Sequence, residues 1–325
     1  MNMNANANAK KRVGIVGARG YVGGELLRLL AAHPGFEVAW VTSSREAGAL
    51  VKDSIPHAPE QLRFDAPNPA ALAARTVDVV FLGLPNGESE PWVCAFCTHS
   101  PRTVIVDISS DHRGPSPTAA GWVYGNPERH RAQIVQSTRI ANPGCYATAM
   151  QLALAPLVAR IAGPAHVFGV SGYSGAGATP SAKNDPEVLR DNIVPYRLVD
   201  HMHEHEVSHE LAHPMCFVPH VAPFFRGLIV TCTFAVREKT NTAELYALLR
   251  AAYEGEPFVR VSDAAPLARD MVMRHDVHIG GLTVSNDGTH GAVVAALDNL
   301  LAGAATQAIR NANLATGQPE ALGLS

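Results

Sequence analysis

The most reactive candidate side chain in this sequence is a cysteine placed where a thiolate would be stabilised. Cys145 follows the turn residues Pro143 and Gly144 and precedes an apolar run, 150–161, whose periodicity predicts a helix. We therefore expect Cys145 at or just before a helix N-terminus, where backbone N–H groups and the positive end of the helix dipole stabilise an anion. A thiol placed there ionises below its usual pKa of about 8.5 and becomes a nucleophile. The alternative is a small side chain buried behind the turn.

Histidines that could transfer protons are concentrated in one later segment. Four of them, His201, His203, His205 and His209, lie within nine residues, and His220 is nearby. Imidazole suits acid–base catalysis because its pKa lies near neutral pH. Zinc binding is the alternative, but no cysteine joins the cluster, and the i, i+4 pair would face one ion only if the segment were helical. We therefore predict an acid–base role and no metal site.

A glycine-rich turn links the first predicted strand, 13–17, to a helix that includes 25–30. Its glycines are spaced as Gly17-x-x-Gly20-x-x-Gly23. Gly17 and Gly20 would let the backbone approach a pyrophosphate, and Gly23 would let the helix pack on the strand. The helix N-terminus would then face the phosphates, which predicts a dinucleotide-binding unit.

The end of the next strand bears on the choice of nucleotide. The strand 36–42 is followed by Ser43, Ser44 and Arg45, without the acidic residue that usually contacts the ribose hydroxyls of NAD. An arginine and two hydroxyls suit the 2′-phosphate of NADP instead. We therefore predict NADP as the cofactor.

Further parallel strands are predicted at 77–83, 103–108 and 139–142. The first ends in Leu84-Pro85-Asn86-Gly87, the second in 109–113, and the third leads to Cys145. Ligands of open parallel sheets bind beyond the C-terminal ends of the strands, so we expect these segments to line one crevice.

The pattern changes after about residue 148. A strand at 167–172 precedes a loop rich in small residues, and 217–220 and 226–234 read as strands of a mixed or antiparallel sheet. The stretch 295–313 is predicted as one long helix, with Asp298 early and Arg310 late as the helix dipole favours.

Composition excludes several classes of protein. The 325 residues carry a net charge of −3, with 47% hydrophobic and 17% charged residues. No basic stripe for nucleic acid and no membrane-spanning run is present. Five cysteines, an odd number, indicate a reducing compartment. Cys94 and Cys97 form a Cys-x-x-Cys pair without a second pair, so we predict that they pack in a helix core.

Taken together, the motifs carry a resemblance that covers nearly the whole chain. The sequence resembles the N-acetyl-γ-glutamyl-phosphate reductase family, within the aspartate-semialdehyde dehydrogenase-like superfamily. The matching segments, in chain order, are Gly14-Ile15-Val16-Gly17-Ala18-Arg19-Gly20-Tyr21-Val22-Gly23, Asp107-Ile108-Ser109-Ser110-Asp111-His112-Arg113, Asn142-Pro143-Gly144-Cys145-Tyr146, Ser171-Gly172-Tyr173-Ser174-Gly175-Ala176-Gly177, 219–227 and 298–308.

The resemblance implies an α/β fold: a Rossmann-type doubly wound parallel sheet plus a second α+β catalytic and dimerisation domain with a mixed sheet. We expect a disordered tail at 1–12, an NADP-binding domain at 13–147 and 296–325, and the catalytic domain at 148–295. It also implies a cytoplasmic homodimer or homotetramer.

The activity implied is NADPH-dependent reduction of N-acetyl-γ-glutamyl phosphate to the semialdehyde, with release of phosphate, in arginine biosynthesis. Cys145 would form a thioester, and His203, oriented by Glu206, would be the acid–base catalyst, with His201 as runner-up. Family members often carry Arg between the two histidines, where this chain has Met202.

The resemblance also implies ligand contacts. The expected cofactor-binding residues are Gly17, Arg19, Gly20, Tyr21, Val22, Ser43, Ser44, Arg45, Pro85, Ser174, Gly175 and Asn299. The expected substrate-binding residues are Arg113, Asn142, Ser171, His201 and Arg226. Two roles stay open: Asn142 either stabilises an oxyanion or braces the turn, and Arg226 either binds the α-carboxylate or forms a structural ion pair.

Two alternatives remain. One is a related acyl-phosphate enzyme of the same superfamily, aspartate-semialdehyde dehydrogenase or an amino-adipyl-phosphate reductase, with the same cysteine chemistry and a different pocket. The other is an NADP-binding sensor without catalysis, which would not need Cys145, the histidines or Arg113.

Overall fold

The computed structural model describes residues 9–115 and 117–324 and divides the chain into two compact units. The first comprises Met1–Asn142 and Ala305–Ser325, and the second comprises Pro143–Ala304. The expected boundaries lay after residues 147 and 295. Most of the expected tail, residues 1–8, lies outside the described residues, whereas Lys11 and Arg12 already belong to the first strand because both pair with its neighbours.

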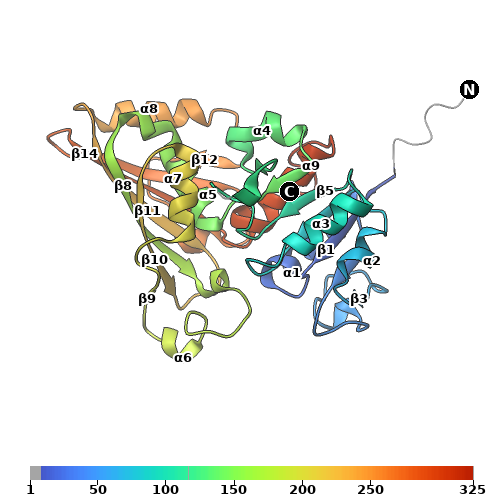
Figure 1. The fold of residues 1–325 in the computed structure, drawn as a ribbon. Helices are drawn as coiled ribbons and strands as arrows, with labels where there is room; N and C mark the ends of the chain where they lie inside the picture. Colours follow the sequence, from blue (N-terminus) through green and yellow to red (C-terminus); the bar gives the residue numbers. More distant parts are fainter. Residues whose placement is uncertain (1–8, 116, 325) are drawn as a thin grey trace, which may run out of the picture. The chain divides into compact units, whose positions relative to one another are not determined.

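The first unit is built on a parallel sheet of the order β3-β2-β1-β4-β5-β7-β6 (Figure 1). Its strands are β1 (Lys11–Val16), β2 (Phe36–Thr42), β3 (Phe64–Asp65), β4 (Val79–Leu82), β5 (Val104–Asp107), β6 (Val123–Tyr124) and β7 (Arg139–Ala141). Its helices are α1 (Tyr21–Ala31), α2 (Pro69–Ala73), α3 (Glu90–His99), α4 (Pro127–Val135) and α9 (Thr306–Ala315). The strand order reverses between β1 and β4, which is where doubly wound sheets bind ligands.

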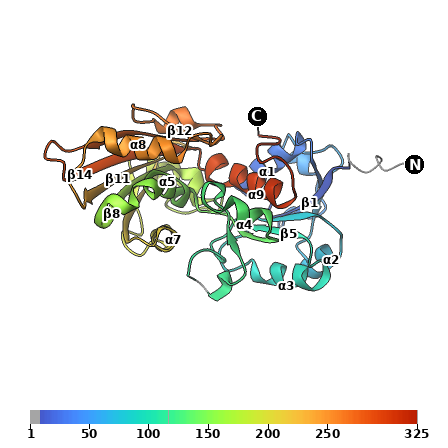
Figure 2. The ribbon, with the colours of Figure 1, turned by 90° about the horizontal axis from the view of Figure 1, so that it is seen from above.

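Helices cover both faces of this parallel sheet. In Figure 2, α2 and α3 lie on one side of the strands, and α1 and α9 lie on the other. The central strands β4 and β5 are therefore buried along their full length, which explains their continuous apolar sequences. The predicted helix 25–30 begins earlier, at Tyr21, because Gly23 and Gly24 continue the helix.

The second unit is built on a mixed sheet of the order β12-β13-β14-β11-β8-β10-β9. Its strands are β8 (Ile161–Gly172), β9 (Val194–Pro195), β10 (Met215–Ala222), β11 (Leu228–Val236), β12 (Val259–Val261), β13 (Val277–Val284) and β14 (His290–Leu297). Its helices are α5 (Cys145–Leu154), α6 (Pro186–Leu189), α7 (Met202–Leu211) and α8 (Thr242–Ala252). Together the two sheets confirm the predicted fold class.

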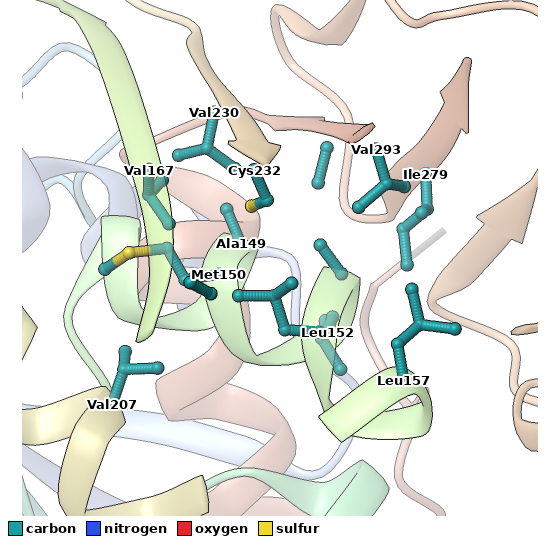
Figure 3. Packing of buried hydrophobic residues seen from close by; sticks show 14 of the residues in the cluster. Ala149, Met150, Leu152, Leu157, Val167, Val207, Val230, Cys232, Ile279 and Val293 are labelled. Carbon is teal, nitrogen blue, oxygen red and sulfur yellow. The ribbon is translucent and has the colours of Figure 1, made fainter. Parts of the chain in front are cut away.

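The core of the second unit lies between its sheet and helices α5, α7 and α8. Every residue of α5 after Cys145 is buried. Figure 3 shows Ala149, Met150 and Leu152 among side chains of the sheet, including Val230, Cys232 and Val293. A helix buried on all sides needs no polar face, which explains the mostly apolar sequence that marked it.

The long helix predicted at 295–313 is wrong. Residues 290–297 form β14, which pairs with β11, because alternating side chains there face the core. Asp298 begins a turn and accepts hydrogen bonds from the backbone of Leu300 and Leu301. A helix begins with a π-helical turn at Leu301–Ala305 and continues as α9. In α9, Arg310 is buried and pairs with Glu128 and Glu320.

The prediction that Cys94 and Cys97 pack in a helix core is also wrong. Both lie on α3 as predicted, but both are exposed, and the buried residues of α3 are Trp92, Val93 and Phe96.

Among the described residues, no helix is long and apolar enough to cross a membrane.

Two glycines of the first unit make a matched test of packing. A Cβ on Gly14 would lie 2.2 Å from a ring carbon of buried Trp40, whereas a Cβ on Gly24 would meet nothing within 4 Å. We expect Gly14→Ala to destabilise the unit by about 1–3 kcal/mol or more through overpacking. Gly24→Ala, within α1, should stabilise it by about 0.5–1 kcal/mol. Differential scanning calorimetry would measure the unfolding midpoint of each variant. Equal midpoints for the two variants would contradict the packing described.

Candidate functional site

Cys145 is the first residue of α5, as predicted. Gly144 is the N-cap, with extended backbone angles and no side chain that could cap the helix. The first-turn N–H groups of a helix have no acceptor within it, and together with the helix dipole they favour an anion beside Cys145. Gly303 packs directly against this residue, because a Cβ there would lie 2.6 Å from the Cβ of Cys145. The thiol is partly exposed.

A buried carboxylate holds the turn before this cysteine. Glu206 lies on α7, is only 3% exposed, and accepts a hydrogen bond of 3.0 Å from the backbone N–H of Gly144. Helix α7 packs against α5, so the bond joins the two helices beside the thiol. Sequence reasoning assigned Glu206 to orienting His203 and missed this contact with the cysteine turn.

The histidine segment forms the start of α7, with His201 as its N-cap. The Nδ1 atom of His201 accepts a hydrogen bond of 3.1 Å from the backbone of His203. Burial, followed by nearby positive charge, lowers the pKa of His201 to about 3, so this ring is uncharged at neutral pH. The ring of His203 lies 4.8 Å from that of His201 and 6.0 Å from that of Tyr146, the residue after the cysteine.

Two tyrosines that sequence reasoning missed belong to the same cluster. Burial, with a smaller contribution from the charge of Cys145, raises the pKa of Tyr196, which therefore stays protonated beside the thiol. Its ring contacts that of His201 and lies 4.9 Å from the Nζ atom of Lys183. Tyr146 donates a hydrogen bond to the carbonyl of His220. No sequence pattern marked Tyr196, because it lies in a loop that folds back onto the cluster.

Polar residues at the end of β8 are tied to the turn after β14. Ser174 is buried and accepts a hydrogen bond of 2.9 Å from Asn299, whose Oδ1 atom accepts from the backbone of Gly227. Buried Ser171 donates to the carbonyl of Gly172, and a Cβ on Gly175 would lie 2.9 Å from the Ser171 hydroxyl. These predicted ligand residues thus form one packed group in the second unit.

Arg226 forms an ion pair with a buried carboxylate. Its Nε atom lies 2.8 Å from Asp298, which is fully buried, and its Nη2 atom donates to the same side chain. This contact matches the structural ion pair that the sequence left as one of two roles.

The glycine-rich turn of the first unit has the close contacts expected of it. Gly17 has a positive φ of 78°, and a Cβ there would lie 2.2 Å from the carbonyl of Gly83, which follows β4. Gly23 has no room for a Cβ because the carbonyl of Gly17 would lie 2.5 Å away, so α1 packs closely on the turn after β1 at this residue, where the sequence predicts packing on the strand. Gly20 is the N-cap of α1, and Tyr21 and Val22 are its first residues.

The loop after β2 contains an acidic residue beyond the serines and arginine. Ser43 is buried and its hydroxyl accepts from the backbone of Arg45 and Glu46, whereas Ser44 and Arg45 are exposed. The Glu46 carboxylate pairs with Arg19 and accepts from Ser54, and the Ser54 hydrogen bond is the main cause of its lowered pKa. Glu46 follows Arg45 directly, so the absence of an acidic residue on which the NADP prediction rests holds only for residues 43–45.

Hydrogen bonds join the loop after β4 to the loop after β5. Asp111 accepts hydrogen bonds from the backbone of Gly87 and from both the backbone and hydroxyl of Ser89. Pro85 is exposed at the start of the first loop. Arg113 lies within the second loop and donates to the carbonyl of Ile108. These contacts bring Pro85 and Arg113 to adjoining loops of the first unit.

Asn142 lies at the end of the first unit and is fully buried. Its backbone donates to Asp107, and its side-chain oxygen accepts a hydrogen bond of 3.0 Å from Asn311 of α9. These contacts favour the bracing role that the sequence left open.

Within the described residues, no group of three or more His, Cys, Asp or Glu side chains is arranged to hold a metal ion.

Family models match both units of the chain. Residues 12–137 match the NAD-binding domain of semialdehyde dehydrogenases, and residues 145–299 match the semialdehyde dehydrogenase dimerisation domain.

Full-length relatives and solved structures are also similar. The chain is 46% identical over 315 residues to the N-acetyl-gamma-glutamyl-phosphate reductase of Xanthomonas euvesicatoria pv. vesicatoria, covering 97% of this chain and 98% of that one. It is 46% identical over 308 residues to the enzyme of the same name from Xylella fastidiosa, covering 95% and 93%. Aspartate semialdehyde dehydrogenase II of Vibrio cholerae, complexed with ASA, shares the fold with a TM-score of 0.75, 18% identity, and coverage of 95% and 99%.

The five cysteines should differ in their reactivity toward iodoacetamide at pH 7. We expect Cys145 to react first, because the helix N-terminus favours its thiolate. Cys94 should lag because its hydrogen bond with Glu90 raises its pKa, and buried Cys232, whose pKa is raised to about 12, should react only after unfolding. Mass spectrometry of timed samples measures this order, with unfolded protein as the control. Equal rates for all five in the folded protein would contradict it.

Proposed function

The chain belongs to the N-acetyl-γ-glutamyl-phosphate reductase family, and on this premise we propose that it reduces N-acetyl-γ-glutamyl phosphate to N-acetylglutamate semialdehyde with NADPH, releasing phosphate, in arginine biosynthesis. The observation that carries the proposal is the position of Cys145. It is the first residue of a buried helix, and Glu206 holds the turn before it.

The Cys145 thiolate is the nucleophile of the proposed reaction. It attacks the γ-acyl carbon, the bond from that carbon to the phosphate oxygen breaks, and phosphate leaves with its electron pair. The product of this step is a thioester on Cys145. Bound NADPH would supply the hydride that reduces the thioester carbon. The tetrahedral adduct then releases the aldehyde as its carbon–sulfur bond breaks, and the sulfur recovers its negative charge.

Backbone dipoles at the start of α5 stabilise the negative oxygen of each tetrahedral intermediate. First-turn N–H groups point out of the helix beside Cys145, and Gly144 offers no side chain to occupy them. Donors of this kind are worth about 10²–10³ in rate where they have been removed from other enzymes. The bond from Gly144 to Glu206 fixes the turn, so these donors are oriented before the substrate binds.

His203 is the acid–base residue we propose, and it would take the proton of the Cys145 thiol to give the thiolate that attacks the substrate. His201 is less suited to give a proton, because its pKa is lowered to about 3 and its Nδ1 atom caps the helix. His203 is only partly buried, and its ring neighbours Tyr146, the residue after the nucleophile. Protonated Tyr196, beside the thiol, offers a further hydrogen-bond donor to the substrate.

NADPH rather than NADH is the cofactor we propose. The glycine turn of Gly17 and Gly20 and the N-terminus of α1 would hold the pyrophosphate. Exposed Ser44 and Arg45 would bind the 2′-phosphate. The Glu46 carboxylate is engaged with Arg19 and Ser54, which makes it a poor partner for ribose hydroxyls and supports this choice.

Arg113 would bind the substrate phosphate, because it lies in the loop that follows the parallel strand β5, and Asp111 bonds this loop to the loop after β4. Arg226 would have a structural role and would not bind the α-carboxylate of the substrate, since its charge is paired with buried Asp298.

The chain would function as a cytoplasmic homodimer or homotetramer. The match of 145–299 to a dimerisation domain supports this assembly. So does the face of the mixed sheet that points away from the core, where Phe168 is 48% exposed.

The proposed activity can be tested in the reverse direction by phosphate-dependent reduction of NADP. We expect turnover of N-acetylglutamate semialdehyde far above that of aspartate semialdehyde, because the relatives that match nearly the full chain are named for the first substrate. Cys145→Ser should abolish turnover and leave NADPH binding nearly intact, since the nucleophile does not hold the nucleotide. Preference for aspartate semialdehyde would favour the related dehydrogenase, and activity in the serine variant would exclude the thioester.

Arg45→Ala should raise the KM for NADPH much more than the KM for NADH, because only NADPH carries the 2′-phosphate. Steady-state kinetics with each nucleotide measures the two changes in KM. Lys52→Ala is a suitable control, because it removes a nearby surface cation that is paired with Glu60. An equal effect of Arg45→Ala on both nucleotides would remove the reason for choosing NADP.

A further inference from the structure

Two histidines of α7 take no part in the proposed reaction. His205 and His209 are exposed and lie four residues apart on this helix, whereas Glu206, Val207 and Leu211 of the same helix are buried. The sequence alone could not pair them, because the pairing required the segment to be helical. Residues 202–211 are helical, so both imidazoles lie on the solvent face, one turn apart.

Residues at this spacing are neighbours on a helix surface, with Cβ atoms about 5–6 Å apart. Two histidines at i, i+4 on one helix face are the ligand pair that metalloproteases use to bind zinc. Imidazole nitrogen suits Zn²⁺, Ni²⁺ and Cu²⁺, and hard oxygen-preferring ions such as Mg²⁺ would bind poorly.

The helix that carries the pair is held at both ends. His201 caps its start through Nδ1, and Ala212 closes its end in the left-handed conformation. Its buried face packs against α5 and β10. The two imidazoles are therefore on a rigid element, which reduces the entropy lost on binding. Asp200 lies 4.0 Å from the Nε2 atom of His205 and adds negative charge beside the pair.

We propose that His205 and His209 form a surface site for one divalent transition-metal ion that prefers nitrogen ligands. The two imidazoles supply two ligands, and water fills the other positions, because the described residues contain no third ligand arranged with them. An ion held by so few protein ligands exchanges readily.

A bound ion would link two turns of α7. The buried face of this helix carries Glu206, which holds Gly144 before the predicted nucleophile. Metal binding should therefore raise the melting temperature of the second unit, because the ion binds the folded helix and not the unfolded chain. This effect does not depend on the proposed reaction.

Nickel titration of the full-length chain tests the site directly. Isothermal titration calorimetry in a chelator-free buffer measures binding of Ni²⁺ in the Cys145→Ser background, so that the reactive thiol does not contribute. His205→Ala and His209→Ala each remove one ligand. His57→Ala is the matched control, because it removes an exposed histidine far along the sequence from α7.

A second control keeps the number of histidines and changes only their spacing. In the double variant His209→Ala/Glu210→His the two imidazoles are five residues apart, or about 140° around the helix, and cannot reach one ion. Circular dichroism would establish that each variant is folded.

We expect one Ni²⁺ per chain and a rise in melting temperature on binding. Affinity should fall about tenfold or more in His205→Ala, His209→Ala and the spacing variant, because each loses the chelate. It should be unchanged in His57→Ala. Unchanged affinity in either single variant, or binding by the spacing variant as tight as that of its parent, would overturn the proposal. Because the readout is binding, its failure would leave the proposed reductase activity untouched.

Discussion

The hydrogen bond from Gly144 to Glu206 is the constraint on which the candidate site depends. A carboxylate as deeply buried as Glu206 is stable only with hydrogen-bond donors around it. Its donor is the backbone N–H of Gly144, the residue before Cys145, so the position of this donor also fixes the position of the cysteine. On the other side of the cysteine, Gly303 leaves no space for even a methyl group. Cys145 is thus held between α7 and the π-helical turn that contains Gly303, and α5 begins where these contacts require.

Much of this arrangement could be predicted from the residues, because it depends on local patterns. The strand predicted at 36–42 is a mostly apolar run that ends at polar residues, and its bounds agree with β2. Cys145 follows a proline and a glycine that stop a strand, so its place at a helix start needed no tertiary information.

The predictions that were wrong depended on contacts between distant segments. Residues 295–297 are compatible with a helix, but they pair with β11, far away in the sequence, and belong to β14. Helix α7 has few apolar residues, chiefly Val207 and Leu211, so its periodicity was too weak to reveal it. Its formation depends on the cap at His201 and on Glu206 reaching Gly144, which no local pattern encodes. The same holds for Tyr196 and for Glu46, whose partner Arg19 lies in another loop.

The discontinuity of the nucleotide-binding unit has a consequence for how the protein is made. Helix α9 supplies Arg310, whose buried charge needs Glu128, and Asn311, which bonds to Asn142, so the parallel sheet lacks these partners until residues beyond 305 have been synthesised. The intervening unit, 143–304, is continuous and has its own core. On the ribosome, where a nascent chain folds as it emerges, the middle of this polypeptide can mature before its beginning does. Until then the early strands are exposed to chaperones and proteases.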